Sequence, residues 1–242
     1  MKANWIAAAV GLATAGLALP RIIAAQRSAR ARVSLAQPNV PLLRLARDSF
    51  AIRFTGMPEG TEVHEFTRAG TGYLYVSESH IGPAFSQRSE VTLDSQLRVI
   101  RARSESRIGQ QRGMSDVTYL GPRALGEAIS TQGSRPGKVH IDTILPAGAF
   151  DGLALYPMIL GRHWQVGDMD TLTIFDTDES SLSRQTIRVT RSEMVRAAGV
   201  SRNALRMELS TTQLPVTLWL SLAAPHRLLK VASANGESTV VK

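Results

Sequence analysis

The chain has 242 residues, no cysteine and a formal net charge of +8, and only 5% of its residues are aromatic. The absence of cysteine excludes a disulfide framework, a thiol nucleophile and a lipid on an N-terminal cysteine. Nucleic acid is not expected as a partner, because aromatic residues are few and no recognition motif is present.

The first 25 residues have the pattern of a secretory signal peptide. Met1 and Lys2 give a short positive start, residues 5–19 are apolar and rich in Ala and Gly, and residues 20–25 carry small side chains. The apolar run is shorter than the roughly 20 residues that a membrane-spanning helix needs. We therefore predict cleavage near Ala25 and a periplasmic or otherwise extracytoplasmic location; an uncleaved anchor is the alternative.

Residues 26–48 are predicted to be a linker. They are rich in arginine and then contain Pro38 and Pro41, which discourage a regular element. At most one short turn of helix is expected over 42–46. A single β domain is predicted over 49–242, a length that suits one large all-β domain.

Beyond residue 49 the hydrophobic period is close to two. In FAIRFTG, Phe50, Ile52 and Phe54 alternate with smaller or polar residues, and GMPEG then supplies the residues of a tight turn. The Asn235–Gly236 pair is the strongest hairpin signal, because a type I′ turn needs positive φ at both central positions. These patterns predict about a dozen strands in one strongly curved antiparallel sheet, a half-barrel.

The arginines of the mature chain are spread along these strands. Residues 1–25 hold two basic residues and no acids, so their removal leaves a net charge of 8 − 2 = +6. The spread is illustrated by Arg98, Arg101, Arg103, Arg107 and Arg112. Such strands could face an anionic membrane surface. The interpretation that we favour is a solvated strand face.

One segment breaks the period of two, HIDTILPAGAFDGLALYPMILGRHWQVGD at 140–168. Residues 149–160 are apolar on nearly all sides, which indicates one short helix buried on the concave face of the sheet. Pro157 should kink or split this helix, because proline removes a hydrogen bond inside a helix. Asp151 is expected at the start of the helix, where the helix dipole favours a negative charge.

No catalytic or metal site is predicted. His140 and Asp142 lie on one face of a strand, but nothing nearby completes a zinc site, so we expect a hydrogen-bonded pair at a strand end. Hydrolase and phosphate-loop motifs are absent. DTDESS at 176–181 lacks the glycine and the glutamate of a calcium loop and predicts a solvated hairpin turn. We therefore expect a protein that is not an enzyme and uses no cofactor.

The predicted ligand-binding residues are apolar. Cavities for lipidic ligands are lined by such side chains, with few polar groups for orientation. For the two tryptophans, packing in the core is the alternative. The predicted set is Phe150, Leu153, Leu155, Tyr156, Met158, Ile159, Trp164 and Trp219.

Three segments resemble, in order and spacing, an uncharacterised family of exported bacterial proteins defined as a domain of unknown function. They are YLGPRALG, HIDTILPAGAFDGLALYPMIL and RMELSTTQLPVTLWLSLAAPHRLLKV, and the likeness covers about 49–242. That family is similar to the lipoprotein-carrier and lipoprotein-receptor fold, which implies a half-barrel with a helical lid over an apolar cavity. The resemblance implies no functional residue, and the chain lacks the lipidated cysteine of true lipoprotein receptors.

The sequence thus predicts an exported envelope protein that binds a hydrophobic ligand (an acyl chain or a lipid) or a lipidated protein in an apolar cavity. The alternative is a structural or assembly component of the cell envelope that binds no small ligand. A hydrolase is the third possibility.

Overall fold

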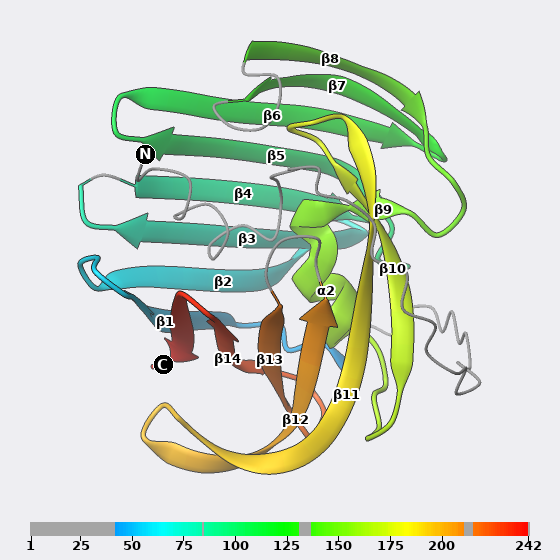
Figure 1. The fold of residues 1–242 in the computed structure, drawn as a ribbon. Helices are drawn as coiled ribbons and strands as arrows, with labels where there is room; N and C mark the ends of the chain where they lie inside the picture. Colours follow the sequence, from blue (N-terminus) through cyan, green and yellow to red (C-terminus); the bar gives the residue numbers. More distant parts are fainter. Residues whose placement is uncertain (1–41, 84, 131–136, 211–214, 242) are drawn as a thin grey trace, which may run out of the picture.

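A computed structural model describes residues 42–83, 85–130, 137–210 and 215–241. The signal-peptide segment and most of the predicted linker lie outside these residues. Within the described part of the chain, fifteen strands form one sheet in the order β8-β7-β6-β5-β4-β3-β2-β1-β15-β14-β13-β12-β11-β10-β9. The predicted curved sheet is confirmed, and it ends at β8 and β9 without closing (Figure 1).

The first eight strands are β1 (Arg47–Phe54), β2 (Gly60–Ala69), β3 (Gly72–Ile81), β4 (Phe85–Leu93), β5 (Val99–Ile108), β6 (Gln111–Leu120), β7 (Arg123–Ser130) and β8 (Gly137–Ile144). A short segment follows, with β9 (Phe150–Asp151), the 3₁₀ helix η2 (Gly152–Ala154) and the α-helix α2 (Leu155–Leu160). The remaining strands are β10 (Met169–Asp176), β11 (Ser181–Ala197), β12 (Val200–Ser210), β13 (Val216–Ser221), β14 (Leu228–Ser233) and β15 (Gly236–Val240).

The strand count exceeds the predicted dozen because some runs with an uninterrupted period contain a tight turn. The run 89–106 is divided between β4 and β5 by a turn in which the Asp94 side chain accepts the backbone N–H groups of Gln96 and Arg98, at 2.8 and 2.9 Å. Strands that follow each other along the chain are antiparallel neighbours, with two exceptions: β9 runs parallel to β10, and β8 and β9 form the two opposite edges of the sheet.

The hairpin at Asn235–Gly236 is present, but the predicted turn type is wrong. Gly236 already pairs with Ser233, so the two turn residues are Ala234 and Asn235, and neither Asn235 nor Gly236 has a positive φ. A Cβ atom on Gly236 would collide with the carbonyl oxygen of Arg53 in the neighbouring strand β1. Glycine is therefore needed here for the close approach of β15 to β1.

The helix expected over 149–160 is confirmed as a short two-part segment on the concave face (Figure 1). The change from η2 to α2 occurs at Ala154, so the split lies upstream of Pro157. Pro157 is in the first turn of α2, where its missing N–H has no intrahelical partner to lose. Asp151 caps η2 as predicted, because its side chain accepts the N–H of Leu153 at 2.8 Å.

The domain begins a few residues before the predicted boundary. Leu42 and Leu43 are buried, the backbone N–H of His226 donates to the Leu42 carbonyl at 2.5 Å, and β1 starts at Arg47. Residues 42–48, assigned from sequence to the linker, therefore belong to the folded unit.

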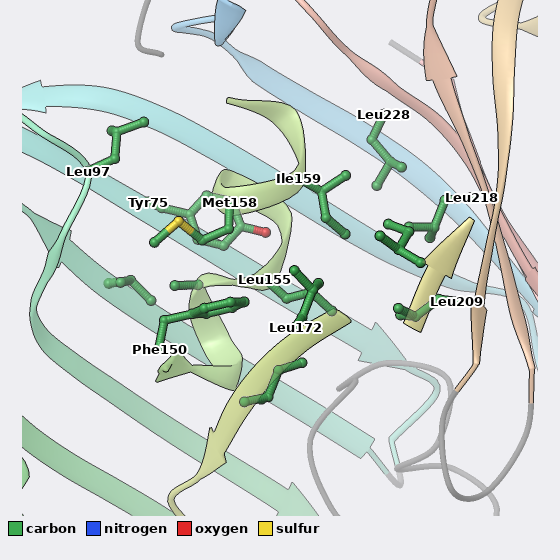
Figure 2. Packing of buried hydrophobic residues seen from close by; sticks show 14 of the residues in the cluster. Tyr75, Leu97, Phe150, Leu155, Met158, Ile159, Leu172, Leu209, Leu218 and Leu228 are labelled. Atoms are coloured by element: carbon green, nitrogen blue, oxygen red, sulfur yellow. The ribbon is translucent and has the colours of Figure 1, made fainter. Parts of the chain in front are cut away.

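Most buried side chains form one cluster between the sheet and the helical segment (Figure 2). A second, smaller cluster consists of Ile52, Ile81 and Phe85. These residues lie near the C-terminal end of β1, at the C-terminal end of β3 and at the start of β4. Among the described residues, no helix is long and apolar enough to cross a membrane.

Candidate functional site

The helical segment is the element that covers the apolar concave face. Figure 2 shows Phe150, Leu155, Met158 and Ile159 projecting from it among the side chains of surrounding strands. Leu155 and Ile159 are each only 2% exposed. The indole N–H of Trp164 donates to the Ile159 carbonyl at 2.9 Å and so satisfies a backbone acceptor at the C-terminal end of α2.

Seven of the eight predicted ligand-binding residues come together in this way. They are Phe150, Leu153, Leu155, Tyr156, Met158, Ile159 and Trp164. Trp219 also packs against the main cluster, but from the opposite side of β13, because its neighbours Leu218 and Leu220 face the concave side. There its indole N–H donates to Glu193 at 2.6 Å, and the side chains of Arg206 and Lys230 lie over its ring.

A chain of buried polar groups lies beside Tyr156. His64 Nδ1 is 2.5 Å from the Tyr75 hydroxyl, and His64 Nε2 is 3.0 Å from Glu62 Oε1. The second oxygen of Glu62 accepts the Ser238 hydroxyl at 3.0 Å. The His64 ring packs edge-on against Tyr156, with centroids 5.1 Å apart. Burial, and then the charge of Glu62, raises the pKa of Tyr156, so its hydroxyl stays protonated.

A small cavity of about 30 Å³ opens at this place, between α2, the start of β1 and the connection from β13 to β14. His64, Tyr75 and Tyr156 line it together with apolar side chains. Arg44, Asp48, Glu65, His226 and Arg227 also line it, and we call this polar group the cavity mouth. The site therefore combines an apolar interior with a charged entrance.

A row of serine hydroxyls crosses the concave face from this cavity. Residues directly opposite each other in an antiparallel sheet share a face. Starting from His64 on β2, the pairing runs through successive strands β3 to β6 by way of Ser77, Ser89, Ser104 and Ser115. Ser89 and Ser115 are buried, and the hydroxyls of Ser104 and Ser115 are 2.8 Å apart. We call these four residues the serine row.

The concave face is therefore divided into a polar and an apolar part. The neighbouring register row, Phe66, Tyr75, Val91, Ala102 and Val117, is apolar apart from the tyrosine hydroxyl and belongs to the cluster beneath the helical segment. Polar and apolar groups thus run side by side across the same strands.

Buried acids mark the other end of the helical segment. The Tyr119 hydroxyl on β6 donates to Asp151, and burial raises the pKa of Asp151 to about 6, against the effect of that hydrogen bond. The turn between β10 and β11 lies close by: burial, and then Asp178, raises the pKa of Asp176 to about 7. Burial, and then Glu179, raises the pKa of Asp178 to about 6. DTDESS does form the predicted hairpin turn, but the turn is not fully solvated: Asp176 and Thr177 are buried and the other four residues are half-buried, beside the pairing of β10 with β9.

The other sequence candidates for chemistry are structural. Asp142 binds Arg123 on the adjacent strand, at 2.9 and 2.8 Å, in place of the expected pair with His140. This ion pair holds the pKa of Asp142 below its usual value. Among the described residues, no three His, Asp or Glu side chains are grouped so that they could hold a metal ion.

Most arginines on β5 and in the turn before it are paired with acids. Arg101 binds Asp116 on β6 at 2.8 and 2.6 Å, and Arg103 lies 3.3 Å from the same carboxylate. Arg98 binds Asp94 at 2.6 Å. Such compensation is typical of a solvated strand face and leaves less charge for an anionic surface.

A larger, open cleft of about 580 Å³ lies on the outer face, where the β11–β12 hairpin curls over β1 and β15. The backbone N–H of Ala198 at the hairpin tip donates to the Val240 carbonyl at 2.9 Å. Ala51 and Arg53 line this cleft from β1. None of the predicted ligand-binding residues lines it.

Sequence reasoning missed the polar part of the concave face. None of the residues predicted from the sequence as ligand-binding is His64 or a member of the serine row. The available signal was the alternation itself: in TEVHEFTR, Glu62 and His64 share the strand face of Phe66, which an apolar core should occupy. A polar residue on an inward face is the informative observation.

The chain belongs to a family described as a protein of unknown function, DUF3108, whose model matches residues 49–238. It is also similar to the crystal structure of a beta-barrel-like protein of the domain of unknown function DUF1849 from Brucella abortus, with a TM-score of 0.55. That likeness covers 83% of this chain and 98% of the other at 13% identity, so it concerns the fold alone. No curated protein matches the sequence. The resemblance to an uncharacterised, barrel-like family is thereby confirmed.

Proposed function

We propose that this protein is an exported envelope protein that binds a hydrophobic ligand, either an acyl chain or a lipidated partner, on the concave face of the half-barrel. The observation that carries the proposal is the cover of that face. A six-residue α-helix and one turn of 3₁₀ helix lie over an apolar sheet surface that a closed barrel or a second sheet would otherwise seal.

The helical segment is suited to move as a lid. In the described part of the chain, α2 makes no backbone hydrogen bond to a strand. Side-chain packing and the hydrogen bond from the Trp164 indole to the Ile159 carbonyl hold it in place. An acyl chain that displaced it would cover the same apolar surface and gain about 0.8 kcal/mol for each buried CH₂ group, before the costs of association. The cavity beside Tyr156 is the place where such a chain would enter.

A second candidate function also has an observation in its favour. The chain's own side chains fill the concave face, and the cavity of about 30 Å³ holds little more than a water molecule. A self-filled core is what a structural or assembly component of the envelope would show. The two functions differ in whether the protein carries a ligand when it is isolated.

Native mass spectrometry of the chain purified from the periplasmic fraction distinguishes them. We expect a chain that lacks about the first 25 residues and retains a lipid-sized mass. A bare chain in complex with another protein would favour the assembly role. A chain of full-length mass found only in the cytoplasm would contradict export.

A blocking variant tests the position of the site. Ala46 lines the cavity, and its carbonyl accepts the Phe66 N–H, a bond that does not involve the side chain. We expect Ala46→Trp to fill the entrance and reduce the retained lipid at least tenfold. Ala51→Trp, on the outer face of β1, is the matched control and should retain lipid like the unmodified chain.

A further inference from the structure

Strand β8 forms one open edge of the sheet (Figure 1). It pairs with β7 over eight residues without a shift of register, and it contains no proline. The strand at the opposite edge, β9, has only two residues. Proteins commonly protect an exposed edge by keeping the strand short or by interrupting it with a proline or a bulge. Strand β8 has none of these features, so its edge can accept a further strand.

One hydrogen bond at the end of β8 shows which of its backbone groups point outward. The N–H of Leu145 donates to the Pro122 carbonyl at 2.7 Å, so this pair is a hydrogen-bonded pair in the register that joins β7 and β8. Hydrogen-bonded and non-hydrogen-bonded pairs alternate along an antiparallel ladder. The N–H and C=O groups of Lys138, His140 and Asp142 therefore point away from β7. Within the described part of the chain, no backbone group pairs with them there.

The side chains of β8 are divided between the two faces of the sheet. Val139 and Ile141 point to the concave face, where Ile141 is buried and Val139 is half-buried beside the open edge. Lys138, His140 and Asp142 are exposed on the outer face. A strand added at this edge would therefore meet apolar groups on one face and charges of both signs on the other.

This charge pattern is complementary to itself in one antiparallel register. When His140 of two copies lies at a twofold axis, Lys138 of each copy is directly opposite Asp142 of the other, and Val139 is opposite Ile141. Opposite charges and apolar groups in directly opposed positions stabilise a strand pair, and like charges destabilise it. Moving the axis by one residue in either direction places Lys138 opposite His140 or Ile144 and removes both ion pairs.

We propose that β8 is a dimerisation edge whose partner is a second copy of this chain, paired antiparallel about His140. The contact is isologous, because each copy contributes the same strand. About six backbone hydrogen bonds join the copies, two for each hydrogen-bonded pair. The axis is perpendicular to the sheet at β8, so the concave faces of both copies open on the same side. This inference is independent of what the concave face binds.

Sedimentation velocity of the purified chain over a series of concentrations tests the dimer. A contact between two single strands is at the small end of protein interfaces, so we expect a dissociation constant on the order of 10 µM. A chain that stays monomeric up to about 200 µM would overturn the inference. A complex with a different protein in place of the second copy would overturn the choice of partner.

Two charge reversals test the register. Lys138→Glu and Asp142→Lys each place like charges opposite one another, and each variant alone should dimerise at least about tenfold more weakly than the unmodified chain. A mixture of the two variants has opposite charges at both positions, so we expect a heterodimer within about threefold of the unmodified affinity. Recovery in the mixture also shows that both variants are folded. A mixture that stays monomeric would contradict the register.

A matched control separates this effect from the loss of any surface ion pair. Lys138 is bound to Glu127 and its side chain is 66% exposed, whereas Arg53 is bound to Glu59 and is 69% exposed. Arg53 is on β1, seven strands from β8 in the sheet order. We expect Arg53→Glu to dimerise like the unmodified chain. Equal weakening by Arg53→Glu and Lys138→Glu would show that β8 is not the contact.

A proline at the edge tests the backbone pairing. His140→Pro removes an N–H that points away from β7, so the β7–β8 ladder keeps its hydrogen bonds, whereas His140→Ala changes only the side chain. We expect the proline variant to dimerise at least about tenfold more weakly and the alanine variant to stay within about threefold of the unmodified chain. Urea denaturation of both variants checks that the fold is kept. A dimer that the proline leaves unchanged uses another surface, and the inference is then wrong.

Discussion

Two buried carboxyl groups, Asp151 and Asp176, and the half-buried Asp178 lie where β9 pairs with the end of β10, and their pKa values link the stability of this contact to pH. The pKa values of Asp151, Asp176 and Asp178 are raised to between about 6 and about 7, mainly by burial. A carboxyl group whose pKa is raised in the folded state does not lower the free energy of unfolding at pH values below its unfolded pKa of about 3.9, where it is protonated in both states. It lowers this free energy at higher pH, because the unfolded state ionises more easily than the folded state. The stability that depends on their protonation is therefore lost between about pH 4 and pH 7.

We expect the free energy of unfolding to fall between pH 5 and pH 8, and Asp178→Asn to reduce that fall by roughly 1–2 kcal/mol. The amide cannot ionise, and its neutrality also relieves Asp151 and Asp176, which both feel the charge of Asp178. Urea denaturation of both proteins at the two pH values measures the difference. The opposing titration of His226 is common to both and cancels. An identical pH dependence in the variant would show that these carboxyls are not coupled to folding.

At the same scale, the candidate site shows how far single residues can be read from sequence. The apolar members, such as Leu155 and Ile159, were predictable because an all-round apolar segment in a β chain must be buried. The placement of Trp219 was not predictable. Strand alternation decides which face of β13 it occupies, and the composition fits either face. The polar members could not be found either: only strand register brings Ser104 next to Ser115 and both into line with His64.

At the scale of elements, strands were predictable and their connections were not. Alternation identified each strand, because one face is wet and the other buried. Turn positions depend on a few side-chain contacts: Asp94 closes a turn inside a run that reads as continuous, and Gly236 is fixed by contact with β1 rather than by turn type. The extent of the helix was also shorter than its apolar pattern, because Pro157 fits only in a first turn.

The helical segment and the sheet should differ in local stability. Sheet strands are held by continuous backbone ladders, whereas α2 depends on side-chain packing. Since the chain has no cysteine, one introduced thiol reports on one position. We expect Met158→Cys to react with a maleimide at least tenfold faster than Ala204→Cys under native conditions, because segments without ladder bonds open more readily.

Ala204 is the matched reference, since it is fully buried within strand β12 and cysteine adds a single sulfur atom. The two reaction rates must be measured at the same pH and protein concentration, in the absence of denaturant. Equal rates would mean that α2 is released only when the whole domain unfolds, and would remove the lid from the proposed function while leaving the apolar face itself unaffected.

At the scale of the whole molecule, the two halves of the chain share one core. The N-terminal strands β1 to β8 and the C-terminal strands β10 to β15 belong to one sheet, joined by the β1–β15 pair, and the main cluster includes Val117 from one half and Leu218 from the other. The length of the chain alone would also allow two small domains. A continuous sheet with a shared cluster instead predicts one cooperative transition.

We therefore expect Val117→Ala, in the N-terminal half, to shift the unfolding transition reported by Trp164 and Trp219, which both lie in the C-terminal half. Val117 on β6 is fully buried, and its truncation should cost about 2 kcal/mol through lost burial and the cavity that remains. Tryptophan fluorescence and far-ultraviolet circular dichroism should give the same shifted midpoint in urea. Leu218→Ala should shift both signals in the same way, by about 3 kcal/mol. If fluorescence stayed at its original midpoint in Val117→Ala while circular dichroism moved, the halves would unfold separately, and a ligand on the concave face could not stabilise the sheet as one unit.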